Sequence, residues 1–144
     1  SLMNLVDSIY IDNKIDILDK NKLTKVIDFA KNRVHTINEI FDETVPFYRY
    51  NPENNKLLYN SFNKDNCKKL FNFWYGSLLS LDNINKQYID ILIKKTSEEL
   101  SINGKDIFHP LRCVLYGNVE GPDLYTIISI LGIKESLLRI KRNI

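Results

Sequence analysis

Cysteine is scarce in this chain, whose 144 residues include only Cys67 and Cys113. The two lie far apart in the sequence and neither belongs to a C-x-x-C pair. Disulfide-rich secreted scaffolds and zinc modules need more cysteines at closer spacing, so both classes are excluded. We interpret the two cysteines as reduced, buried residues of a cytoplasmic protein. A single disulfide between them stays an alternative.

Long apolar runs are also missing, because no stretch approaches the ~20 residues that a membrane-spanning helix needs. No positively charged segment followed by an apolar one opens the chain, so no signal peptide is predicted. An excess of one charge is absent as well, since the net charge is +2. Nucleic-acid-binding domains are often strongly basic, and the charge by itself therefore does not indicate a nucleic-acid partner. We expect no membrane association.

Motifs of catalysis and metal binding are absent too. The sequence contains no glycine-rich phosphate loop, nucleophile elbow or cluster of zinc ligands. The two histidines, His35 and His109, lie far apart, and we interpret each as a capping or surface residue. No metal site is therefore predicted. What the chain does contain is a composition of 44% hydrophobic and 26% charged residues, which is typical of a globular protein with a buried core.

Apolar residues recur at helical spacing along most of the chain, and no segment alternates in the way that is typical of a strand. We therefore predict an all-α fold. The predicted helices cover about residues 21–34, 36–46, 65–81 and 84–102, with one or two short helices between Met3 and Asp19 and two more after residue 122, separated by Gly132. A length of 144 residues suits one domain or two small helical subdomains. We predict two, over residues 3–81 and residues 82–144, with the break at Asp82-Asn83 between them.

Local signals mark the limits of several of these helices. Thr36 and Glu39 have the spacing of a capping box at a helix start, and Pro46 ends that helix. Residues 47–56, rich in asparagine, are predicted to form a loop. Gly76 lies inside a predicted helix at a cost of about 1 kcal/mol relative to alanine. We therefore expect another helix to approach closely at Gly76.

The segment from His109 to Pro122 contains two of the four prolines and two of the five glycines. Pro110 suits the first turn of a helix and Gly117 suits the position just after its end. Pro122 suits the start of the next helix in the same way. The predicted product is a short helix bearing Arg112, a tight turn, and a helix N-terminus with unpaired N–H groups. Such a geometry is able to receive a phosphate or the polar edge of a base.

This segment resembles a known family. Its residues are similar, in type and spacing, to the C-terminal anticodon-binding region of the bacterial glutamyl-tRNA synthetases, which are class I enzymes. The residues that carry the resemblance are Pro110-Leu111-Arg112, Leu115, Gly117, Glu120-Gly121-Pro122, Leu124, Leu131-Gly132, Lys134-Glu135 and Leu138-Arg139. A shorter match, Arg33-Val34-His35-Thr36-Ile37-Asn38-Glu39, is similar to an arginine that precedes a threonine-led helix in the same family.

The resemblance implies that the chain grips the anticodon loop of glutamate tRNA, as a monomer and with no DNA or membrane partner. It implies that Arg33 meets the third anticodon base, that Gly121 and Leu124 meet the first, and that Arg112 contacts the RNA. The parent would be a glutamate–tRNA ligase, which uses ATP with magnesium to activate glutamate. The His-Ile-Gly-His-like and Lys-Leu-Ser-Lys-like motifs of that chemistry are absent, so we expect a non-catalytic fragment that holds no cofactor.

Each candidate residue also has a structural explanation. Arg112 could form an ion pair with Glu120 or Asp123. Arg33 could interact favourably with the dipole at a helix end, and the side chain of Leu124 could pack in the core. Other candidates come from side-chain chemistry: Tyr48 and Tyr116 for stacking on bases, and Arg139 for a phosphate contact or a solvated helical face. For the whole chain, the alternatives are a helical protein–protein interaction module and a stand-alone enzyme with an unrecognised site.

Overall fold

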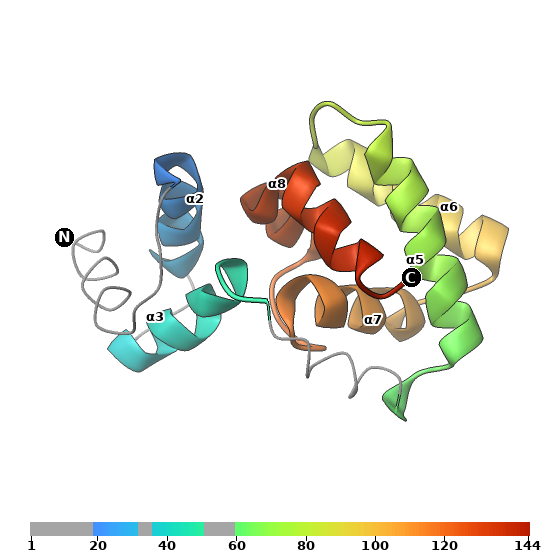
Figure 1. Ribbon diagram of the computed structural model, residues 1–144, viewed down its shortest axis with the longest axis horizontal. Helices are drawn as coiled ribbons and strands as arrows, with labels where there is room; N and C mark the ends of the chain where they lie inside the picture. Colours follow the sequence, from blue (N-terminus) through green and yellow to red (C-terminus); the bar gives the residue numbers. More distant parts are fainter. Residues whose placement is uncertain (1–18, 32–35, 51–59) are drawn as a thin grey trace. The chain divides into compact units, whose positions relative to one another are not determined.

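The computed structural model describes residues 19–31, 36–50 and 60–144. Every regular element among these residues is a helix (Figure 1), so the all-α prediction is confirmed. The elements are α2 (Lys20–Lys31), α3 (Ile37–Thr44), the 3-10 helix η1 (Val45–Phe47), α5 (Lys64–Leu79), α6 (Lys86–Leu100), α7 (Lys105–Tyr116) and α8 (Leu124–Lys141). The short helices expected before Asp19, and residues Arg33 and His35, lie outside the described residues.

The chain divides into two compact units, residues 1–50 and residues 51–144. The boundary that we expected after Leu81 falls inside the second unit, because α5 packs against α6, α7 and α8. Trp74 of α5 shows why. Its side chain is fully buried and its Nε1 donates a hydrogen bond of 3.0 Å to Thr96 Oγ1 of α6. The break at Asp82-Asn83 is therefore a turn between two helices that share one core.

In the first unit, α2 buries the predicted apolar stripe of Leu23, Val26, Ile27 and Ala30. The Thr36 side chain caps α3, because its Oγ1 accepts a hydrogen bond of 3.1 Å from the Glu39 N–H. A cap of this kind stabilises a helix by about 1 kcal/mol. Helix α3 ends at Thr44, and Pro46 lies in η1 directly after it, as expected from the missing N–H of proline.

In the second unit, α8 packs on α5, α6 and α7, and α7 and α8 lie side by side (Figure 1). Asparagine side chains begin two of the helices. Asn63 accepts from the Asn66 N–H before α5, and Asn85 accepts from the Tyr88 N–H before α6. The largest fully buried side chains of this unit are Trp74, Phe71, Leu70, Leu78, Ile89, Ile107, Leu111 and Leu115. Gly76 is exposed and an added Cβ would meet nothing within 4 Å, so the expected close helix contact there is wrong.

Pro110 lies inside α7, and the prediction that it opens a helix is therefore wrong. The helix begins earlier, after Gly104, whose φ of 55° and carbonyl bonds to Ile107 and Phe108 start the first turn. A proline inside a helix removes one N–H donor and crowds the preceding turn. The Pro110 ring is buried, and this apolar packing offsets part of that cost.

The other limits of this segment are closer to prediction. Gly117 ends α7 in the left-handed conformation, with φ of 83°, and its N–H donates to the carbonyls of Arg112 and Cys113. Helix α8 begins at Leu124 rather than at Pro122, because Asp123 is the capping residue. Gly132, with φ of 81° and ψ of 162°, interrupts α8 as predicted.

Candidate functional site

Arg112 extends from α7 toward the turn that precedes α8. Its Nε donates a hydrogen bond of 2.9 Å to the main-chain oxygen of Pro122. Its Cζ lies 5.6 Å from the centre of the Phe108 ring, one helical turn earlier. Among the described residues, neither of the expected competitors, Glu120 and Asp123, forms an ion pair with Arg112. An arginine has five N–H donors, and the four on its two Nη atoms have no acceptor among the residues that the structure describes.

Asp123 is engaged at the start of α8. Its carboxylate accepts from the Thr126 N–H at 2.8 Å and from Thr126 Oγ1 at 3.0 Å. These bonds satisfy one of the donors in the first turn, where N–H groups have no partner within the helix. In the described part of the chain, the N–H groups of Leu124 and Tyr125 have no acceptor. They are therefore available to an acceptor that enters beside Arg112.

Gly121 packs against Tyr116. Its φ is 150°, and a Cβ at this position would lie 2.8 Å from Cε2 of the Tyr116 ring. The turn therefore needs a glycine here for packing, whatever else approaches it. Tyr116 is only 6% exposed, which argues against the stacking role that we expected for it.

Leu124 is 2% exposed, so its side chain belongs to the core. The core explanation that we weighed for this residue is confirmed. A contact between Leu124 and a ligand would have to use the backbone.

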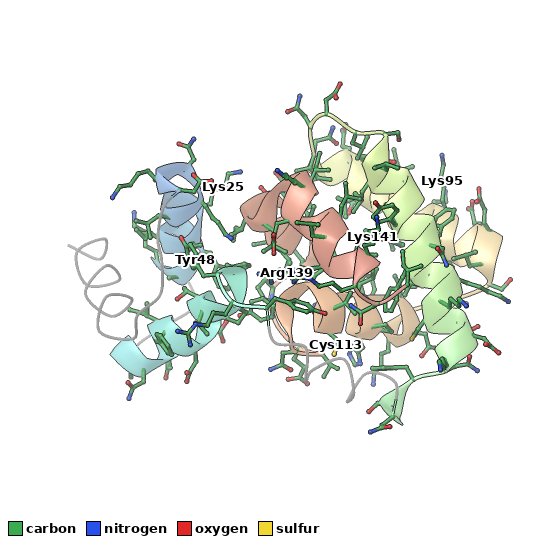
Figure 2. The ribbon with its side chains drawn as sticks, in the orientation of Figure 1. Lys25, Tyr48, Lys95, Cys113, Arg139 and Lys141 are labelled. Carbon is green, nitrogen blue, oxygen red and sulfur yellow. The ribbon has the colours of Figure 1, made fainter. Side chains whose placement is uncertain are left out.

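Arg139 is a structural residue. It is 2% exposed, its Nε lies 3.0 Å from Glu135 Oε1, and its Nη1 donates a bond of 2.7 Å to the Leu115 carbonyl near the end of α7. Figure 2 shows this side chain extending between α8 and α7. Neither a phosphate contact nor a solvated helical face fits such burial. Glu135, one turn earlier on the same helix, was the only sequence signal of this pairing.

Tyr48 belongs to the first unit, where its ring is half-buried and carries the Lys22 ammonium 4.7 Å from its centre. This cation–π contact uses one face of the ring. Arg33 lies outside the described residues. The predicted site residues that the structure brings together are thus Arg112, Gly121, Leu124 and Tyr116, all around one turn.

A cleft of about 350 Å³ opens beside Arg112. Its walls come from three helices, and α6 contributes residues that sequence reasoning missed. The lining residues are Lys86, Ile89, Asp90 and Ile93 of α6, Phe108 and Arg112 of α7, and Asp123, Leu124 and Tyr125 at the start of α8. No motif marks the α6 residues, because only the packing of α6 against the later helices brings them to the site.

Metal and thiol chemistry find no support here. The described residues contain no group of three or more His, Cys, Asp or Glu side chains that would hold a metal ion. His109 is half-buried, with its ring 6.2 Å from that of Phe62, and it lies inside α7 and so does not cap a helix. Cys67 and Cys113 are buried and form no disulfide, as predicted. Burial raises the pKa of both thiols, that of Cys67 to about 11, so both are protonated and unreactive at neutral pH.

None of the helices in the described part of the chain combines the length and the hydrophobicity needed to cross a membrane. An all-helical fold with a polar-rimmed cleft beside a helix N-terminus defines a small binding domain. A family model described as an anticodon binding domain matches residues 1–144, and the chain belongs to this family. The resemblance that we drew from the segment around Arg112 is thereby confirmed.

The similar proteins include bacterial glutamate–tRNA ligases. The chain is 31% identical over 125 residues to that of Desulforudis audaxviator and 30% identical over 126 residues to that of Carboxydothermus hydrogenoformans. Each alignment covers 85% of this chain and 25% of the relative, so the chain spans a quarter of the length of these curated relatives. A glutamate–tRNA ligase of Staphylococcus xylosus is 34% identical over 80 residues, which are 56% of this chain and 67% of that protein.

Two solved structures share the fold. A glutamate tRNA ligase from Elizabethkingia meningosepticum, in complex with its amino acid, matches with a TM-score of 0.73 at 19% identity, over 99% of this chain and 28% of that one. A glutamate-tRNA synthetase from Elizabethkingia anophelis matches with a TM-score of 0.71 at 21% identity, over 99% and 27%. Both matches show that this chain shares its fold with part of those proteins.

Proposed function

We propose that this chain is the anticodon-binding region of a glutamate–tRNA ligase and that it binds the anticodon loop of glutamate tRNA. The family match over residues 1–144 and the glutamate–tRNA ligase relatives support this function. The geometric observation that supports this function is the orientation of Arg112, whose Nε donates a hydrogen bond of 2.9 Å to the Pro122 carbonyl. The planar fork is thereby oriented while its Nη donors stay open to a ligand.

Binding uses the single-stranded part of the tRNA, because only unstacked bases present their Watson–Crick edges to side chains. Arg112 donates to the acceptors of one base edge, with a geometry that a lysine does not offer. The N–H groups of Leu124 and Tyr125 donate to acceptors of the first anticodon base. Gly121 is half-buried beside the ring of Tyr116, and the exposed part of its backbone is open to the RNA. Arg33, outside the described residues, meets the third anticodon base.

The whole protein, of which this chain would be the anticodon-binding part, joins glutamate to its tRNA with ATP and magnesium. That chemistry belongs to a catalytic domain outside this sequence, and this chain is non-catalytic by itself. Its contribution is to position the tRNA so that the acceptor end reaches the catalytic site. Both helical units take part in this grip. We propose that the protein works as a monomer in the cytoplasm.

The test is the affinity of the 144-residue chain for two RNA stem-loops, one with the glutamate anticodon and one with its middle base changed. We expect clear preference for the first, since base contacts rather than phosphate contacts carry specificity. Affinity should fall as salt rises, by about 0.7 logarithmic units per phosphate neutralised for each tenfold increase in salt. Equal affinity for both loops, or none for either, would refute the proposal and favour a helical module that binds proteins.

A further inference from the structure

A second hollow of this unit, separate from the cleft beside Arg112, is an apolar groove between the end of α5 and the second half of α8. Its volume is about 480 Å³. Leu79 of α5 and Leu138 of α8 line it, and they are 60% and 45% exposed. Four large apolar side chains of the described residues are that exposed, and this groove holds two of them. Such a concentration of exposed apolar surface marks an interaction site.

Two lysines of α8 border this apolar surface. Lys134 and Lys141 are exposed, both line the groove, and seven residues separate them, so they lie on one face of the helix, about 10.5 Å apart along its axis. Among the described residues neither ammonium group forms a hydrogen bond or an ion pair. The groove has one carboxylate, that of Asp82, in the turn after α5. The wall formed by α8 is therefore basic.

A helix of another protein fits this surface better than RNA or a small molecule does. Unstacked bases bind to aromatic rings and guanidinium planes, and Tyr75 is the only aromatic side chain among the described residues that line the groove. A small ligand needs a site that covers most of its surface, whereas the exposed leucines show that this groove is open to solvent.

An amphipathic helix, by contrast, binds to an open groove with apolar anchor positions. Helices α5 and α8 pack against each other (Figure 1), so a third helix in the groove between them contacts both. Leu79 and Leu138 provide one apolar contact on each side. The two lysines lie two turns apart, which is the spacing of side chains on one face of the incoming helix as well.

We propose that the groove between α5 and α8 binds an acidic amphipathic helix of a partner protein. Apolar side chains of that helix cover Leu79 and Leu138, and two of its carboxylates pair with Lys134 and Lys141. Charge complementarity fixes the orientation, because the acidic side of the helix faces α8. The groove shares no lining residue with the cleft beside Arg112, so this inference does not rest on the proposed RNA binding.

The probe is a designed peptide of about 20 residues, held helical by a side-chain staple, with leucines on one face and glutamates beside them. Fluorescence anisotropy measures its affinity for the 144-residue chain, and the affinity of a second peptide in which every glutamate is a lysine. We expect the acidic peptide to bind at least about tenfold more tightly, and this ratio to fall as salt screens the charges. Equal affinity for the two peptides, or binding of neither, would overturn the proposal.

Apolar variants locate the peptide on the chain. Leu138→Asp places a charge on the apolar surface and should weaken the acidic peptide about tenfold or more. Ile91→Asp is the matched control, because Ile91 of α6 is 53% exposed and does not line this groove. It should bind the peptide as wild type does, and circular dichroism checks that both variants remain helical. Equal losses in the two variants would contradict binding at the groove.

Charge reversal tests the pairing with α8. Lys134→Glu combined with Lys141→Glu should reverse the preference, so that the lysine peptide binds more tightly than the acidic one. Lys94→Glu combined with Lys95→Glu makes the same change at exposed positions of α6 outside the groove, and should keep the wild-type preference. A preference that survives the reversal on α8 would remove the lysines from the site.

Other occupants of the groove give different results. Dimerisation in sedimentation velocity that Leu138→Asp abolishes would assign the groove to a second copy of the chain. A tenfold loss of stem-loop affinity on reversing Lys134 and Lys141, with peptide preference unchanged, would assign it to RNA. Either result would overturn the proposal. Peptide binding as expected, together with no binding of either stem-loop, would refute only the proposed function.

Discussion

Two arginines of the second unit, Arg112 on α7 and Arg139 on α8, each donate a hydrogen bond to a main-chain oxygen, yet they differ in burial and in what their side chains contact. Arg139 is almost fully buried and divides its donors between Glu135 and the Leu115 carbonyl. Arg112 is half-buried, uses Nε for the Pro122 carbonyl, and lines an open cleft. The difference teaches that a basic residue is available to RNA only when the protein itself leaves donors unused.

Removing Arg139 is expected to have the largest effect, and that effect is on stability. Arg139→Ala takes away the charged donor that Glu135 and the Leu115 carbonyl share, so the free energy of unfolding should fall by about 3 kcal/mol. Urea unfolding followed by circular dichroism measures it. Lys141→Ala, at an exposed position of the same helix, is the control and should change stability by less than about 0.5 kcal/mol. If Arg139→Ala kept wild-type stability but lost affinity for RNA, Arg139 would be the RNA contact and not a structural residue.

The turn that Arg112 holds gives the second test. Gly121→Ala places a Cβ 2.8 Å from the Tyr116 ring at a φ of 150°, and should lower the free energy of unfolding by about 2 kcal/mol. Gly76→Ala is the matched control, because a Cβ there meets nothing within 4 Å and the helix gains up to about 1 kcal/mol. Unchanged stability of Gly121→Ala would mean that this glycine serves the approach of RNA and not the packing of the turn.

Arg112→Ala should affect binding more than folding. The loss of one half-buried hydrogen bond costs about 1 kcal/mol of stability. Affinity for the glutamate stem-loop should fall by roughly 1–3 kcal/mol, and most of the preference over the loop with a changed middle base should disappear. Arg112→Lys keeps the charge but loses the planar fork, so it should restore little. Equal losses for both loops would make Arg112 a phosphate contact without a role in base recognition.

Cys67 extends the comparison to a buried thiol, for which we expect the smallest effect. Burial, with smaller contributions from Asp106 and Cys113, raises the pKa of Cys67 to about 11. A free thiol titrates near pH ~8.5, so the unfolded chain loses this proton first. The contribution of the protonated Cys67 thiol to the free energy of unfolding is therefore full below that pH and is lost as the pH rises toward 11. The stability difference between wild type and Cys67→Ala should therefore shrink over this range in urea unfolding, and a constant difference would contradict the assignment.

Helix positions and several of their ends followed from the sequence because their causes are local. The stripe from Leu23 to Ala30 and the cap at Thr36 depend on residues within about one or two turns. Gly117 is similar, since a left-handed end needs only a residue without a side chain. Pro110 was not predicted correctly from local signals. The helix starts earlier, at Gly104, and the proline ring is buried inside the helix instead of lying in its first turn.

The candidate site was half predictable. Arg112, Gly121 and Leu124 lie within one short segment, so a contiguous resemblance was sufficient to find them. Tyr116 and Arg139 were misjudged, because the sequence does not tell which aromatic ring or guanidinium a neighbouring element covers. The ring of Tyr116 packs on Gly121, and Arg139 reaches the Leu115 carbonyl on another helix.

By itself, then, the sequence determined the all-helical class, most helix ends and the family, each of which depends on short-range patterns of side chains. Tertiary structure decided the position of the unit boundary at residue 50, the burial of Arg139, and the arrival of Lys86 and Asp90 beside Arg112. The physical reason is that burial and the lining of a cleft depend on which helices pack together. Those contacts join residues that are distant along the chain, and no local pattern encodes them.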